Sequence, residues 1–106
     1  MVVVELRIEF RLGGCRSLKE KRQRLRGLRD RFGKQPNLAV VESNYADSHR
    51  RAQWSFVAAA SASEVVEKQL AEIERHISIG VDAEIVSIRR LERHCDVDDS
   101  LSPGVW

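Results

Sequence analysis

Cysteine, proline, glycine and aromatic residues are all scarce in this chain of 106 residues, which has two Cys, two Pro, six Gly and 6% aromatics. With 42% hydrophobic and 32% charged residues, the composition excludes collagen-like, coiled-coil and wholly disordered proteins. The longest apolar runs, residues 1–4 and 56–60, fall far short of the ~20 residues that span a bilayer. Residue 1 leads directly into an alternating pattern and not into a signal peptide. We therefore expect one soluble, cytoplasmic, globular domain with no membrane partner and no cofactor.

The net charge of +2 hides a strong asymmetry along the chain. Residues 16–34 carry nine cations and only two anions, whereas the remaining residues are net acidic. Such a basic segment indicates an anionic partner, and nucleic acid, acidic protein and lipid headgroups are the candidate classes. Because a chain this short buries only ~60–70% of its surface on folding, we also expect self-association, most simply as a homodimer.

Hydrophobic periodicity predicts the first half of the fold. Residues 2–12 alternate between apolar and charged side chains, which is typical of a half-buried strand. Ser17 and Glu20 have the spacing of a capping box, so a helix is expected to begin near Leu18 and to end near Gly33.

The second half has the same plan. Strands are predicted over residues 38–43 and 53–60, separated by a polar loop over residues 44–52. A second capping box, Ser61 with Glu64, is expected to open another helix that ends at Gly80. The last strand is predicted over residues 81–91.

This order of elements predicts a ferredoxin-like α+β fold, βαββαβ, with a four-stranded antiparallel sheet and two helices on one face. Right-handed crossovers place the first strand between the third and the fourth. We assign residues 1–91 to a single ferredoxin-like domain. Residues 92–106 are predicted to form an acidic, flexible C-terminal tail, whose aspartates could compete for the basic helix.

This topology brings the end of the first strand, the start of the first helix and the polar loop to one end of the sheet, where the helix dipole favours anions. Lys21 falls inside the apolar arc of its helix, so its stem is expected to lie on the core with its ammonium at this end. Arg16, Lys21 and Arg51 are then predicted to cradle one phosphate. The plain structural alternative is a snorkelling lysine with no ligand.

A second feature of the same helix is a row of cations at spacings i, i+3, i+7 and i+10, about 15 Å long at ~1.5 Å per residue. We call this row the basic stripe. It consists of Lys19, Arg22, Arg26 and Arg29. Such a row can follow several phosphates of a nucleic acid, and the alternative is a solvated helix face.

Other chemistry is disfavoured by position and spacing. Cys15 and Cys95 follow antiparallel strands, so they are expected at opposite ends of the sheet, too far apart for a disulfide. A catalytic Cys15 would need an arginine where Lys21 stands. The run of His94, Cys95 and Asp96 is interpreted as a chance cluster and not as a metal site.

The predicted open face of the sheet carries Glu5, Arg7, Glu9 and Arg11. It lacks the aromatic side chains on which RRM-type sheets stack bases. Alternating charges fit a contact between two subunits across a two-fold axis, and a merely solvated face is the alternative.

Residues 16–22, RSLKEKR, resemble the signature of the YlxP-like family of small bacterial proteins. The opening strand with its glycine-rich exit, the Arg51-Ala52 pair and residues 80–84 are also similar, so the resemblance covers about residues 1–91. It implies a ferredoxin-like fold, a cytoplasmic setting and genes placed among those for translation and ribosome maturation, with no established catalytic residues. His49 stands where relatives tend to have tryptophan, and the segment from Glu92 onward has no recognised counterpart.

From these observations the sequence predicts a non-enzymatic RNA- or ribosome-associated accessory protein that grips phosphates through its first helix. One alternative is an acylphosphatase-like hydrolase in which Arg16 and Asn44 bind the anion and position water, an idea that rests on fold analogy. The other is an oligomeric interaction module whose basic helix meets an acidic protein.

Overall fold

The computed structural model describes residues 1–95, which form six elements in the predicted order. These are β1 (Val2–Arg11), α1 (Leu18–Phe32), β2 (Leu38–Asn44), β3 (Arg51–Ala60), α2 (Ser63–Gly80) and β4 (Glu84–His94). β4 continues three residues past the predicted end of the domain, because His94 still pairs with Val2 at the start of β1. Residues 96–106 of the predicted acidic tail, which include its aspartates, lie outside the described part of the chain.

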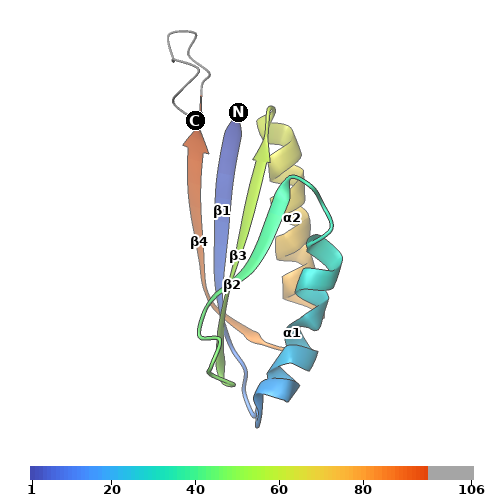
Figure 1. The fold of residues 1–106 in the computed structure, drawn as a ribbon, viewed down its shortest axis with the longest axis vertical. Coiled ribbons are helices and arrows are strands. Elements are labelled where there is room, and N and C mark those ends of the chain that lie inside the picture. The colour runs from blue at the N-terminus through green and yellow to red at the C-terminus, as the bar shows by residue number, and fades with distance from the viewer. Residues whose placement is uncertain (96–106) are drawn as a thin grey trace.

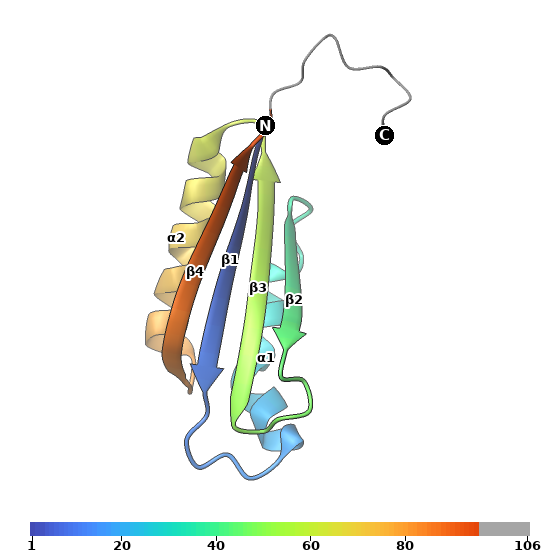
Figure 2. The same cartoon turned by 90° about the vertical axis from the view of Figure 1, so that its left-hand side faces the viewer.

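The four strands form one antiparallel sheet in the order β2-β3-β1-β4. Both helices cover the same face of this sheet, and no element of residues 1–95 covers the opposite face, which we call the open face (Figures 1 and 2). β1 lies between β3 and β4, as the crossover rule predicts. The fold is therefore the predicted ferredoxin-like α+β arrangement.

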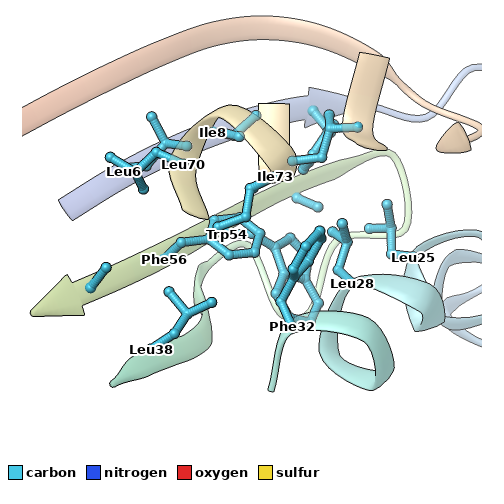
Figure 3. Close-up of a cluster of buried hydrophobic side chains, with 14 of the residues drawn as sticks. Leu6, Ile8, Leu25, Leu28, Phe32, Leu38, Trp54, Phe56, Leu70 and Ile73 are labelled. Carbon is cyan, nitrogen blue, oxygen red and sulfur yellow. The ribbon is translucent and has the colours of Figure 1, made fainter. Parts of the chain in front are cut away.

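The core lies between the sheet and the helices and is built from the alternation in β1. Val4, Leu6, Ile8 and Phe10 are at most 1% exposed, and they face the helices together with the even-numbered residues of β3. Figure 3 shows side chains from β1, β3 and both helices converging in this layer. Burial of such apolar surface supplies the main favourable free energy of folding, about 25 cal/mol per Å².

The predicted start of α1 is confirmed, with its hydrogen bonds. The Glu20 N–H donates to Ser17 Oγ (3.1 Å), and the Arg16 N–H donates to Glu20 Oε2 (2.6 Å). This second bond is the main reason why the pKa of the Glu20 carboxyl lies below its ordinary value. Two free donors of the helix N-terminus are thus already used within the chain.

The second predicted capping box is wrong. α2 begins at Ser63, and Ala62 occupies the capping position without any side-chain hydrogen bond. The start of α2 follows instead from the packing of its apolar face, which consists of Val66, Leu70, Ile73 and Ile77. Within residues 1–95, neither helix has the length and hydrophobicity that crossing a bilayer requires.

Candidate functional site

The basic stripe is exposed along α1 and is not neutralised by the part of the chain that the structure describes. No member of the stripe forms an ion pair with any carboxylate of residues 1–95. Three other cations of the same helix do have carboxylate partners: Lys21 with Glu42, Arg24 with Glu20 and Asp82, and Arg31 with Glu72. The unpaired charge of α1 is therefore concentrated on one side of the helix.

A groove with a volume of about 590 Å³ runs along this side of α1. All four residues of the basic stripe line one wall, and the other wall includes Glu42 and Trp54 with residues 46–47 of the loop between β2 and β3. We call this feature the α1 groove. It forms because α1 packs over β2, the edge strand of the sheet.

Trp54 is the residue of this groove that sequence reasoning did not identify. The strand pattern places it on the helix-facing side of β3, where it is 7% exposed. Its indole Nε1 is buried and has no hydrogen-bond acceptor among the described residues. The guanidinium carbon of Arg29 lies 5.4 Å from the centre of the Trp54 ring, within the range of a cation–π contact.

Lys21 lies where the helical wheel predicts, with its stem in the core and its ammonium at the loop. The residue is 3% exposed. Its Nζ donates to the carbonyl oxygens of Tyr45 and Ser48, both at 2.7 Å, and lies 3.1 Å from Glu42 Oε2. Since an ammonium has three donors, the protein itself uses all of them, and Lys21 has no free donor for a phosphate.

Arg51 lies on the open face of the sheet, away from the α1 groove, because residues of β3 alternate between the two faces. Its Nη2 donates to Glu9 Oε1 (2.8 Å) and to Tyr45 Oη (2.7 Å), and its guanidinium carbon lies 3.9 Å from the centre of the Tyr45 ring. The hydrogen bond with Glu9 raises the pKa of Arg51 and lowers the pKa of Glu9.

The predicted phosphate cradle of Arg16, Lys21 and Arg51 is therefore not assembled. The Lys21 ammonium is held at the loop by its own three acceptors. Arg51 lies on the open face and is bound to Glu9, so these two cations do not join Arg16 around one phosphate. For the hydrolase alternative, Asn44 Oδ1 accepts a hydrogen bond from the N–H of Tyr45 (2.8 Å). No hydrogen bond joins Asn44 to Arg16 among the described residues.

Three of the four charges predicted to pair between two subunits have partners within the chain. On the open face, Arg7 Nη2 lies 3.1 Å from Glu5 Oε1, and Arg51 pairs with Glu9. No aromatic side chain of the four strands lies on this face, since Trp54, Phe56 and Phe10 all face the helices. The homodimer stays a prediction. Sedimentation of the purified protein would test it by measuring the oligomeric state.

The two cysteines are free and lie at opposite ends of β1. Cys15 is buried just after the strand, whereas the N–H of Cys95 donates to the carbonyl oxygen of Met1 (2.7 Å). Among residues 1–95 no three His, Cys, Asp or Glu side chains are grouped so that they could hold a metal ion.

Comparison with known proteins gives the family and no activity. A search of the curated proteins finds no match. A family model described as "Protein of unknown function (DUF503)" matches residues 3–90, which include the whole of the α1 groove. This match covers most of the chain and agrees with the RSLKEKR segment at the start of α1. The chain belongs to the DUF503 family, the YlxP-like family.

Proposed function

We propose that this DUF503 protein is a cytoplasmic, non-enzymatic accessory protein that associates with RNA, most simply ribosomal RNA, through the basic stripe of α1. One observation carries the proposal. The four cations of the stripe are exposed and aligned beside a groove, and they have no ion-pair partner among residues 1–95, although other cations of the same helix have carboxylate partners.

The chemistry of the stripe favours phosphate groups. Three of its four members are arginines, whose planar guanidinium groups bind phosphate oxygens with two parallel hydrogen bonds. A row of about 15 Å, at ~1.5 Å per residue, fits a backbone of repeated charges better than a single small anion. Each phosphate that the stripe neutralises releases counterions, so the affinity for RNA should fall steeply with salt.

The test is the salt dependence of RNA binding. We would measure fluorescence anisotropy of a labelled ribosomal RNA fragment between 50 and 200 mM salt, for the wild-type protein and for Arg22→Ala and Arg26→Ala. Each substitution should reduce the slope of log K against log salt by about one. Arg31→Ala is the matched control, because Arg31 faces α2, lies 3.5 Å from Glu72 and is outside the stripe, and it should leave the slope unchanged.

A salt response that is flat, or that is the same in all four proteins, would contradict the proposal.

A second measurement addresses the cellular partner. The protein should co-sediment with one ribosomal subunit at low salt and leave it at high salt. If a complex with an acidic protein survives nuclease treatment instead, the interaction-module alternative is correct.

A further inference from the structure

The two walls of the α1 groove differ in chemistry. The α1 wall presents the cations of the basic stripe together with one carboxylate, that of Asp30. The opposite wall presents the ring of Trp54 and the carboxylates of Glu42 and Asp47. Glu42 is already bound by Lys21, whereas Asp47 is exposed and forms no ion pair with the described residues. A ligand that fits both walls needs an anionic part for one and an aromatic, hydrogen-bonding part for the other.

Trp54 supplies the aromatic part of the groove. Its side chain is 7% exposed and lines the groove. Its indole Nε1 is closed to solvent, so a ligand in the groove meets the ring and the Arg29 guanidinium over it, and not the N–H.

Arg29 connects the two walls. It belongs to the basic stripe, and its guanidinium is held over the Trp54 ring at 5.4 Å. Nucleobases stack on aromatic rings and on arginine guanidinium planes. Because Arg29 is exposed, the side of its guanidinium away from Trp54 is accessible to a planar base.

We propose that the α1 groove is a binding site for a single unstacked nucleotide. The base stacks on the outer face of the Arg29 guanidinium, which the Trp54 ring supports from the other side, and the phosphate lies on Arg22 and Arg26. This inference rests on the proposed function and names the part of the RNA that the protein recognises. The groove volume of about 590 Å³ is within the range of ~300–1,000 Å³ that is usual for small-ligand sites.

This site selects unpaired RNA. In a duplex the bases are stacked and the major groove is too narrow for side chains to read, whereas nucleotides in loops, bulges and ends can be splayed out. A duplex can therefore use the basic stripe but not the α1 groove. A free mononucleotide has the same chemistry as an unpaired RNA nucleotide, so the experiment must distinguish these two sources.

The sequence offers a direct probe, because Trp54 and Trp106 are the two tryptophans of the chain. In a Trp106→Phe protein, tryptophan fluorescence reports on Trp54 alone. We would titrate this protein with an unlabelled single-stranded RNA of eight mixed nucleotides, with an RNA duplex and with AMP. The single strand should change the Trp54 emission saturably, and the duplex should bind, as measured by anisotropy, without changing it. Saturation by AMP at a lower concentration than by the single strand would identify a free nucleotide as the source.

Two variants test the groove. Arg29→Gln removes the guanidinium on which the base stacks, whereas Trp54→Phe puts a smaller ring beneath that guanidinium and leaves the four cations of the stripe in place. Each should weaken binding of the single strand by about tenfold, within the range expected from base stacking of 1–3 kcal/mol. Because Arg29 also belongs to the stripe, Trp54→Phe is the variant that separates the two features, and it should leave binding of the duplex unchanged. Trp106→Phe is the matched control for the tryptophan substitution and should bind like the wild type. Unfolding in urea would show that each variant is folded.

The outcomes distinguish this inference from the proposed function. If single-stranded RNA and AMP bind without changing Trp54 emission, or if both variants bind the single strand as tightly as the parent protein, the nucleotide site is wrong. Salt-dependent RNA binding would then still support the basic stripe. If neither RNA binds in any salt, the proposed function itself fails.

Discussion

Lys21 and Glu42 form a largely buried ion pair, with Nζ 3.1 Å from Oε2, that joins the middle of the first turn of α1 to the end of β2. The Lys21 side chain is 4% exposed and the Glu42 side chain 25%. The same ammonium also holds two carbonyl oxygens of the loop between β2 and β3. This arrangement fixes the wall of the α1 groove opposite the basic stripe, so a lysine that binds no phosphate still shapes the site.

The first prediction concerns this pair. Lys21→Met should lower the free energy of unfolding by about 3–5 kcal/mol, because it leaves the Glu42 carboxylate and two carbonyl oxygens without their partner. Lys19→Met is the matched control, since Lys19 is exposed on the same turn, and it should change stability by about 0.5 kcal/mol or less. Urea unfolding measures both. Equal stability of the two variants would show that the Lys21 contacts contribute little.

The second prediction compares the two serines of the predicted capping boxes. Ser17→Ala should cost about 1 kcal/mol, because the Glu20 N–H then loses its acceptor at the start of α1. Ser61→Ala should be close to neutral, since α2 has no side-chain cap. The two midpoints in urea decide this. A comparable loss in both proteins would indicate that Ser61 caps α2 after all.

These cases show what the sequence can predict and what it cannot. The strand alternation and the Ser17–Glu20 pair are local patterns, and each determines its own element. Lys21 was recognisable because a cation in an apolar arc is an anomaly within one helix. Its partner Glu42 was not recognisable from the sequence. The contact between the two side chains depends on how α1 packs over β2, and no local pattern encodes that packing.

Two residues were misjudged for different reasons. Arg51 was placed in the polar loop predicted over residues 44–52, but β3 already begins at Arg51. Its side chain therefore has the opposite parity to Trp54 and Phe56 and lies on the open face. The position of Trp54 in the lining of the α1 groove could not be predicted from the sequence. Its apolar ring fits a core position, and only the neighbouring edge strand and the position of Arg29 place it beside a groove. The failed Ser61 cap shows that a short motif yields to the packing of the apolar face of a helix.

The third prediction concerns pH and His76, which packs edge-on against Phe32 with ring centres 5.4 Å apart. Burial lowers the pKa of His76, and the nearby Arg31 lowers it further, while Glu72 opposes them. The unfolded chain, with an ordinary histidine pKa of about 6.5, therefore binds a proton at a higher pH than the folded protein. Stability should be fully present above this value and should fall as the pH is lowered through it.

Unfolding in urea between pH 7.5 and 5.5 tests this, because the carboxylates titrate at lower pH. His76→Gln should reduce the loss of stability across this window, whereas His94→Gln, at a side chain that is 65% exposed, should not. If the wild-type protein and His76→Gln lose stability equally over the window, burial of the His76 ring does not control it.

The fourth prediction is a stabilising substitution in α1. Gly27 lies in the interior of the helix, and a Cβ added there would meet only His76 Nε2, at an ordinary contact distance of 3.9 Å. Gly27→Ala should therefore raise the free energy of unfolding by about 0.5–1 kcal/mol, because alanine loses less backbone entropy on folding. Gly33→Ala is the contrasting control, since a Cβ there would lie 2.5 Å from the carbonyl oxygen of Arg29, and it should destabilise the protein. If both urea midpoints rise, the end of α1 adjusts to accept a side chain at Gly33. If both fall, His76 packs more tightly on Gly27 than the structure shows.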